Sequence, residues 1–263
     1  MQVFWNIVRL AFRQQLTYRV AILAGMVTNL FFGLLRVALL IALYQGRSEV
    51  NSLDVSGAIT FIALSQSLIA FLEVFGSFGL MDSVYTGSIG SDLIKPLNLF
   101  TLWLGRDFGR SLVNLLGRGG LFALGFMLFY PLKLPPRLES WLALPFALIL
   151  GWLTSFAWRF LVNMAAFWSP DGRAIGRGLY TFSQFFSGFI IPLRILPDWF
   201  SHLAHYTPFP AMLNTPIEIY LGVISGQEIL TALLFQTIWF GTLVLVGQGV
   251  YRLGIRRLVI QGG

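Results

Sequence analysis

Four charged residues lie inside runs of apolar sequence, and their side chains are the ones best placed for ion chemistry. They are Arg36, Glu73, Arg118 and Arg159. A charge in a hydrocarbon environment is costly, so each should face protein or water and find a partner. The helical rise puts Glu73 and Arg159 at the same depth, roughly 25 Å below one membrane edge. We therefore predict that Glu73 pairs with Arg159 near the opposite surface; the alternative is that one of them extends alone to the interface.

Signatures of catalysis and nucleotide binding are missing from the sequence. No glycine-rich turn is followed by Lys-Ser or Lys-Thr, which excludes a Walker-type phosphate loop, and no serine lies in a glycine elbow. Glu73 is the one carboxylate that could serve a proton-driven carrier, and it lies off-centre. His202, His205 and Asp198 could together bind a metal, but polar residues on an outer helix are the simpler interpretation. We predict no catalytic residue, metal site or cofactor in this chain.

The composition indicates that lipid is the solvent for much of the chain. Hydrophobic residues make up 56% of the sequence and charged residues 11%, whereas a soluble domain has roughly a quarter charged. There are 25 phenylalanines and no cysteine, so disulfides and thiolate metal sites are excluded. A soluble domain of this length could not hide so much apolar surface.

The apolar runs predict an all-α polytopic membrane protein with a single domain over residues 1–263. Runs of sufficient length predict six membrane spans, at 20–44, 56–78, 104–130, 141–168, 176–191 and 230–251. The third has a charged start, with Arg106, Asp107 and Arg110 before its apolar part.

Three further segments are not predicted to cross the membrane. Residues 1–19 are amphipathic and basic, which is typical of a helix in the membrane interface. Residues 81–100 are polar and rich in turn formers, so they should lie outside the bilayer as a short helix that ends at Pro96. Residues 192–222 contain five prolines between short apolar pieces, which predicts an outer, re-entrant hairpin.

The distribution of basic residues predicts the orientation, because cytoplasmic ends carry the excess of Lys and Arg. One set of ends carries Arg9, Arg13, Arg19, Lys95, Arg106, Arg110, Arg173, Arg177, Arg252, Arg256 and Arg257. The other carries Arg47, Lys133, Arg137 and Arg194 with several carboxylates. Both termini and residues 81–100 should therefore be cytoplasmic, and the proline-rich hairpin should face outward.

Two stretches carry a resemblance to a known family. The first is residues 85–97, YTGSIGSDLIKPL, and the second is the hairpin with Ser187–Pro192, Leu196–Trp199 and Thr207–Phe209. Together with the predicted layout, they resemble the membrane subunit of type-2 ABC exporters (the ABC-2 family), in the branch of paired permeases of about 260 residues. In that family the first stretch is the cytoplasmic coupling segment, and the second is the outer hairpin.

The resemblance implies a permease of the bacterial cytoplasmic membrane that exports an amphiphilic or hydrophobic substrate. Its partners would be two ABC ATPase subunits that carry ATP and Mg, a second identical or related permease, and membrane lipid, with no nucleic acid. It assigns contact with the ATPase to Tyr85, Ile89, Asp92, Leu93 and Lys95. For Asp92 and Lys95 the alternative is an ordinary solvated loop. The competing function is a membrane scaffold or assembly subunit without a transport path.

Overall fold

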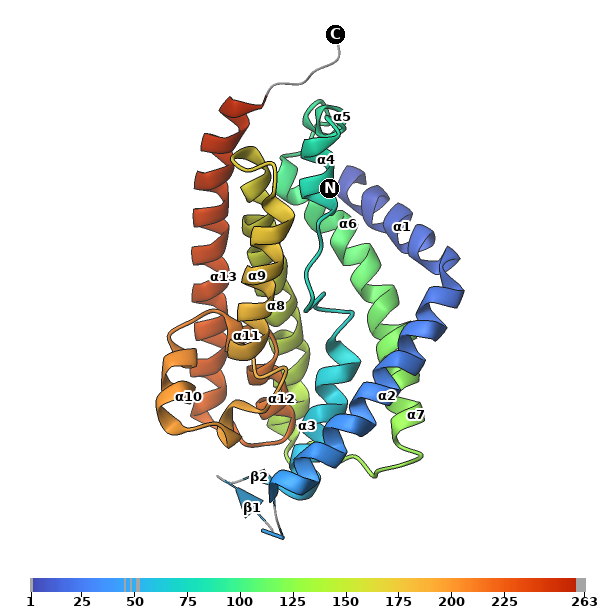
Figure 1. Ribbon diagram of the computed structural model, residues 1–263, viewed down its shortest axis with the longest axis vertical. Helices are drawn as coiled ribbons and strands as arrows, with labels where there is room; N and C mark the ends of the chain where they lie inside the picture. The colour runs from blue at the N-terminus through green and yellow to red at the C-terminus, as the bar shows by residue number, and fades with distance from the viewer. Residues whose placement is uncertain (1, 45, 48, 51–52, 259–263) are drawn as a thin grey trace.

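A computed structural model describes residues 2–44, 46–47, 49–50 and 53–258; Met1 of the predicted interface helix lies outside them. The chain is mainly helical, and its long helices run along the longest axis of the molecule (Figure 1). Within the described residues, three helical runs are long and apolar enough to cross a membrane. They are α2 (Arg19–Tyr44), α8 (Leu138–Asn163) with η2 (Met164–Phe167), and α13 (Gln227–Gly254) with η4 (Ile255–Arg257).

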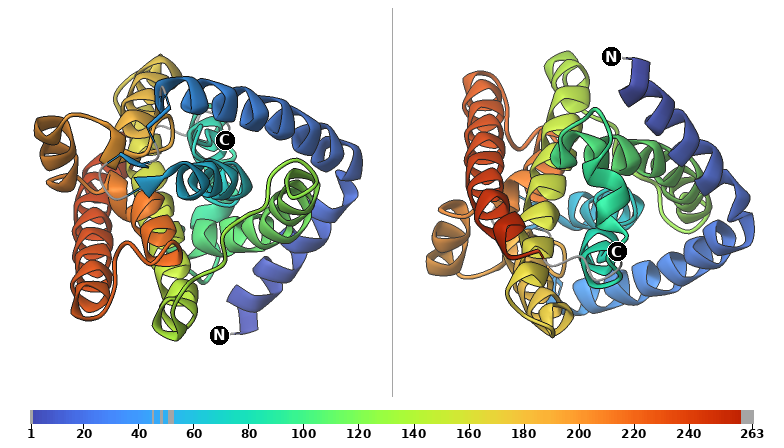
Figure 2. Two further views of the ribbon diagram at one scale, coloured as in Figure 1. Left: turned by 90° about the horizontal axis from the view of Figure 1, so that it is seen from below. Right: turned by 90° about the horizontal axis from the view of Figure 1, so that it is seen from above.

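Helix α1 (Gln2–Thr17) packs along α6 (Leu99–Val113), and two glycines of α6 allow the contact. A Cβ at Gly105 would lie 3.1 Å from the Phe4 ring, and one at Gly109 would overlap the Val8 carbonyl. These glycines are four residues apart, so they share one helix face. Seen along the long axis, α1 and α2 meet at a corner on the outside of the bundle (Figure 2).

The second predicted span, 56–78, is only partly helical. Helix α3 (Val55–Leu68) starts at Asp54, whose carboxylate accepts a hydrogen bond from the Gly57 N–H at 3.0 Å. The helix ends at Leu68, and residues 69–78 form an irregular segment before α4 (Gly79–Tyr85). Glu73 has a φ of 47° and Gly76 a φ of 83°. Such angles interrupt a helix, and the sequence pattern did not predict this interruption.

The third predicted span, 104–130, is a longer helix with a widened turn. It consists of α6, the π-helical segment η1 (Asn114–Gly119) and α7 (Gly120–Phe126). A Cβ at Gly119 would overlap the Ser67 carbonyl, so the widened turn lies where this helix packs closely against the end of α3. The fifth predicted span, 176–191, corresponds to α9 (Gly172–Phe186), which begins earlier and ends earlier.

The proline-rich stretch forms short helices beside α8 and α13 (Figure 1). They are η3 (Leu193–Ile195), α10 (Asp198–His205), α11 (Phe209–Met212) and α12 (Asn214–Tyr220). Arg194 Nε lies 2.8 Å from Glu218 Oε1 and joins two of these pieces. Most of α11 and α12 is buried, so this stretch is packed protein and not a solvated loop.

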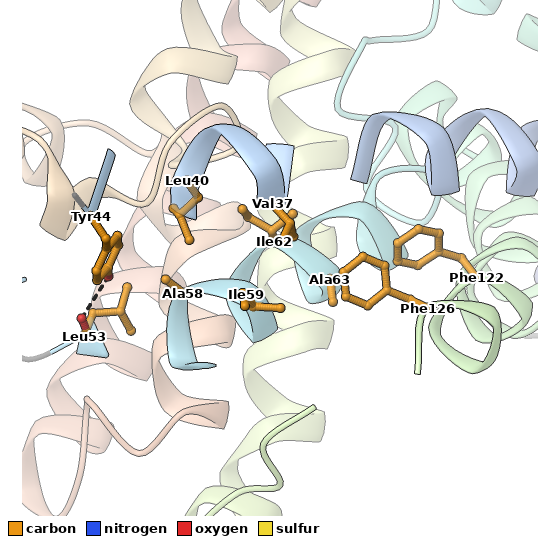
Figure 3. Close-up of a cluster of buried hydrophobic side chains, with 10 residues drawn as sticks. All are labelled: Val37, Leu40, Tyr44, Leu53, Ala58, Ile59, Ile62, Ala63, Phe122 and Phe126. Carbon is orange, nitrogen blue, oxygen red and sulfur yellow. Dashed lines mark hydrogen bonds between the residues drawn. The ribbon is translucent and has the colours of Figure 1, made fainter. Parts of the chain in front are cut away.

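A buried apolar cluster holds α2, α3 and α7 together (Figure 3). Its members are Val37, Leu40, Tyr44, Leu53, Ala58, Ile59, Ile62, Ala63, Phe122 and Phe126. At its edge the Tyr44 hydroxyl donates to the Leu53 carbonyl at 2.8 Å. Beside it lies the antiparallel pair β1 (Glu49–Val50) and β2 (Leu53–Asp54), the only departure from helix among the regular elements that the structure describes. This cluster therefore fixes the end of the bundle opposite α4.

Candidate functional site

A charge cluster lies where the irregular segment 69–78 meets α6 and α8; it consists of Glu73, Asp107, Arg110 and Arg159. Asp107 and Arg159 are buried and Glu73 and Arg110 are partly exposed, and we call the four residues the buried charge cluster. Arg159 Nη1 lies 2.6 Å from Glu73 Oε2 and 2.7 Å from Asp107 Oδ1. Arg110 Nη2 lies 3.1 Å from Glu73 Oε1 and 3.0 Å from Asp107 Oδ1. Two guanidinium groups thus face two carboxylates, so the cluster has no net charge. Balanced, hydrogen-bonded charges are the form in which ions tolerate burial.

The sequence predicts contact between Glu73 and Arg159, and the structure shows that contact, but it gives Arg159 a second partner. Asp107 is 1% exposed, and its carboxylate accepts hydrogen bonds from both terminal nitrogens of Arg159 and from Trp152 Nε1, the last at 2.9 Å. In the sequence, Asp107 lies in the charged start of the third predicted span. The three-residue spacing of Asp107 and Arg110 puts both on one face of α6, and that was the available signal.

Side chains from other helices satisfy the backbone of the irregular segment. Asn114 Nδ2 donates to the Ala70 carbonyl at 3.2 Å, and Ser155 Oγ donates to the Leu72 carbonyl at 2.6 Å. The Ser77 carbonyl accepts from Asn163 Nδ2 at 2.7 Å and from the Tyr180 hydroxyl at 3.2 Å. Buried backbone outside a regular helix requires this kind of support, because its polar groups have no partner within the segment.

Asn163 links this region to α4. Besides the bond to Ser77, its Nδ2 donates to the Arg159 carbonyl at 2.7 Å, and its Oδ1 accepts from the Met81 N–H at 2.8 Å. One buried amide therefore joins α8, the irregular segment and the first turn of α4. A displacement of α4 would strain bonds next to the buried charge cluster.

Residues 81–100 form two short helices, where the sequence predicts one. Helix α4 ends at Tyr85, α5 runs from Ile89 to Leu93, and α6 already begins at Leu99. Gly87, between α4 and α5, has a φ of 73°, a conformation that glycine adopts at little cost. Asn98 accepts a hydrogen bond from the Thr101 N–H at 2.7 Å and so sets the start of α6. We call residues 79–98 the α4–α5 hairpin.

Asp92, one of the predicted ATPase contacts, is an internal anchor of this hairpin. It is 3% exposed, Arg106 donates to its two oxygens at 2.6 and 2.7 Å, and Lys95 Nζ lies 2.8 Å away. Burial disfavours its charged form, but the bonds from Arg106 and Lys95 outweigh burial and hold the pKa of Asp92 below its ordinary value. Ile89 is also fully buried. Both side chains therefore hold the hairpin in place and leave its surface to other residues.

The outer surface of the hairpin is formed by neighbours of these anchors. Ile94 is 85% exposed, and Tyr85 and Lys95 are also exposed. The Tyr85 hydroxyl donates to the Ser169 carbonyl at 2.7 Å, and Arg173 Nη2 lies 2.6 Å from Asp82 Oδ1. These bonds join the hairpin to the turn before α9 and to the first turn of α9.

The remaining predicted charges find neutral partners. Arg36 Nη1 donates to the Phe189 carbonyl at 2.9 Å, and its guanidinium lies 4.0 Å from the centre of the Phe189 ring. Arg118 Nη2 donates to Asn29 Oδ1 at 2.8 Å. Leu93, another predicted ATPase contact, is half-buried in α5.

The polar residues considered for metal binding lie on α10. His202 and His205 share its last turn, and His205 Nδ1 lies 2.6 Å from the Ser201 carbonyl. In the described part of the chain, no group of three or more carboxylate or imidazole side chains could hold a metal ion.

Comparison with protein families decides the class of this chain. The sequence profile described as "ABC-2 family transporter protein" matches residues 24–262. The chain belongs to this family. An ABC-2 transporter protein is a membrane transport component and not itself an ATPase, so the predicted family and the predicted permease class are confirmed. No curated protein matches the chain. The whole of α1 lies ahead of the matched range.

Proposed function

We propose that this chain is the membrane-spanning permease subunit of an ATP-driven ABC exporter of the bacterial cytoplasmic membrane. It crosses the membrane six times, has both ends in the cytoplasm, and works with two separate ABC ATPase subunits and a second permease. The observation that carries the proposal is the α4–α5 hairpin. It projects at one end of the bundle, beside α1 and the end of α13 (Figure 1).

The surface of the hairpin suits a protein contact. Ile94 is the most exposed large apolar side chain in the described part of the chain, and Tyr85 and Lys95 flank it on the same hairpin. Aromatic and apolar side chains surrounded by polar ones are typical of the few residues that dominate binding at interfaces. The bonds of Asp92 and Asp82 keep the hairpin rigid, so a push on Ile94 would be transmitted to α6 and α9.

Through Asn163, the same push would reach the buried charge cluster. The irregular segment 69–78 joins α4 to α3, and it contains two backbone positions with positive φ, Glu73 and Gly76. A chain segment of this kind can absorb a change of angle that a continuous helix would resist. We therefore assign it the role of the hinge through which ATP binding by the partner tilts the spans.

Exposed apolar faces support partners in the membrane. Val20, Phe31 and Leu39 of α2 and Leu245 of α13 are each more than half exposed. In a lone chain these faces meet lipid, and in a permease pair one of them would meet the second subunit. A transport path lined by such exposed apolar faces would suit an amphiphilic or hydrophobic substrate.

The orientation can be tested directly because the sequence contains no cysteine. Ser91→Cys on the α4–α5 hairpin and Gln227→Cys at the start of α13 would each introduce a single exposed thiol. A membrane-impermeant maleimide applied to intact cells should label only Gln227→Cys, and inverted vesicles should label Ser91→Cys. The reverse pattern would refute the orientation.

The coupling role is tested with the ABC ATPase co-expressed from the same organism. Ile94→Asp should lower the amount of ATPase that co-purifies with the permease by about tenfold or more, as expected for loss of a residue worth about 1.4 kcal/mol or more. Leu134→Asp, at an exposed position near the other end of the bundle, is the matched control. Equal recovery of ATPase with both variants would refute the coupling role and leave the scaffold function.

A further inference from the structure

A cavity of about 350 Å³ lies between α1, α6 and the end of the α4–α5 hairpin. Its polar wall includes Gln14, Tyr18, Lys95, Trp103, Arg106 and Arg110. Leu10 and Leu102 are among the apolar residues that line it. The cavity thus combines cationic groups with an apolar side, which is the chemistry of a site for an anionic amphiphile.

The charge at the cavity favours an anion. None of the described residues that line it is acidic, and three are cationic. Asp92, which is not among the lining residues, is shared by Lys95 and Arg106. Two cations against one carboxylate leave a net positive charge beside the cavity. Arg110 is balanced within the buried charge cluster and adds no net charge.

Two residues that line the cavity each carry a buried N–H group without a partner among the described residues; these groups are Trp103 Nε1 and Arg110 Nε. Both atoms are closed to solvent, and both residues also border a neighbouring pocket beside Asp107 and Arg159, so these two groups do not mark a ligand in the cavity. The groups that the cavity offers to an anion are the charged ends of Lys95 and Arg106, which supply the hydrogen bonds and the charge that hold a phosphate.

The position of the cavity selects lipid as the source of that phosphate. Helix α1 exposes both apolar side chains, such as Trp5 and Leu10, and basic ones, such as Arg9 and Arg13. A helix with this surface lies at the level of the lipid headgroups, and it contains no acidic residue. With the proposed orientation, the cavity faces the cytoplasmic leaflet, where anionic headgroups are available to basic pockets.

We propose that this cavity is a binding site for the phosphate headgroup of an anionic phospholipid of the cytoplasmic leaflet, which is retained there and not transported. The lipid would occupy the gap between the interface helix and the ATPase-contacting hairpin. It would join Gln14 of α1 to Lys95 of the hairpin and Arg106 of α6. The inference rests on the proposed orientation, whereas the binding itself needs neither ATP nor the ATPase.

The test measures lipid retention by the delipidated, purified permease with native mass spectrometry. Added phosphatidylglycerol should be retained at least about fivefold more than phosphatidylcholine. Gln14→Glu places a carboxylate in the cavity wall and should lower phosphatidylglycerol retention about fivefold, whereas Gln14→Lys should raise it. Asn6→Glu and Asn6→Lys make the same charge changes at an exposed position on α1 that does not line the cavity.

Retention that changes at Gln14 and not at Asn6 supports the site. Equal effects at both positions mean general attraction to α1, and no effect at Gln14 means that the cavity is not used; either result overturns the proposal. The gain expected for Gln14→Lys cannot arise from misfolding. Inorganic phosphate at millimolar concentration should not displace the lipid, and displacement would assign the cavity to a free anion instead. The maleimide experiment on Ser91→Cys checks the orientation separately.

Discussion

Replacing Asp107 by Asn should strongly destabilise the protein, because it removes one charge from a balanced and buried set. The substitution keeps the shape of the side chain but leaves Arg110 and Arg159 facing only Glu73. Breaking a buried ion pair by removing one partner costs about 3–5 kcal/mol. Asp107 belongs at the upper end of this range, since it is 1% exposed and receives bonds from Arg159, Arg110 and Trp152.

The assay is thermal unfolding of the purified permease in detergent. For a chain of this size, about 3–5 kcal/mol corresponds to a fall in Tm of roughly 6–20 °C. The control is Asp54→Asn, which removes an exposed ion pair with Lys133 and keeps a residue that can cap α3. An exposed ion pair contributes at most about 1 kcal/mol to stability, so the Tm of the control should fall by less than about 4 °C.

A second substitution separates charge imbalance from lost packing. Asp107→Asn combined with Arg110→Gln leaves Glu73 opposite Arg159 and restores electrical balance. This double variant should be more stable than the sum of the two single effects predicts, by about 0.5–3 kcal/mol. If the Tm of Asp107→Asn falls no further than the Tm of Asp54→Asn, the account of the buried charge cluster is wrong. It is also wrong if the effects of Asp107→Asn and Arg110→Gln on stability are simply additive.

Three other predictions concern α1, the hinge and the hairpin. Gly109→Leu should detach α1 from α6 and speed tryptic cleavage at Arg13, whereas Gly178→Leu, which has open space around it, should not. Gly76→Ala should destabilise the protein by about 1–3 kcal/mol, since the φ of Gly76 is positive and a Cβ there would overlap Tyr180. Gly87→Ala has a positive φ but open surroundings, so it should destabilise the protein less. Thermal unfolding measures both variants. The pKa of Asp92 is lowered in the folded protein, so its charged form stabilises the fold. This stabilisation is complete above the unfolded pKa of about 3.9 and is lost as the pH falls through the lower folded value. The difference in Tm between the wild type and Asp92→Asn should therefore be constant from pH 5 to 8 and shrink below about pH 4; a difference that varies between pH 5 and 8 would contradict this assignment.

Apolar periodicity and charge spacing predicted the class of the protein and one of its central contacts. The contact between Glu73 and Arg159 followed from their equal depth in the second and fourth predicted spans. Asp107 and Asn163 were missed because their role depends on helices that approach each other only in three dimensions. Hydropathy reports whether a segment prefers lipid, and it does not report whether the segment is helical throughout. The run 56–78 was therefore predicted as one span, although α3 ends at Leu68.

The same limit applies to residues 81–100. Their composition predicted a polar segment outside the membrane, and the resemblance assigned ATPase contacts to Ile89 and Asp92. The structure buries both, since Asp92 finds Arg106 fourteen residues away. Sequence spacing could not show which side of so short a helix faces the protein. Ile94, the most exposed apolar residue of the hairpin, therefore takes the place of Ile89 and Asp92 in the proposed contact.

The interruption of the second predicted span also constrains how the protein is made. Helix α3 contains 14 residues, about 21 Å in length, and the hydrocarbon core of a bilayer is about 30 Å thick. Residues 69–78 would have to cover the remaining distance. In this segment the carbonyls of Ala70, Leu72 and Ser77 accept hydrogen bonds from side chains, and the donors are Asn114, Ser155, Asn163 and Tyr180. The ribosome synthesises all four of these side chains later than the segment they support. Residues 69–78 therefore reach their final state only after α9 has been synthesised, so the folding of this segment depends on tertiary contacts that form late.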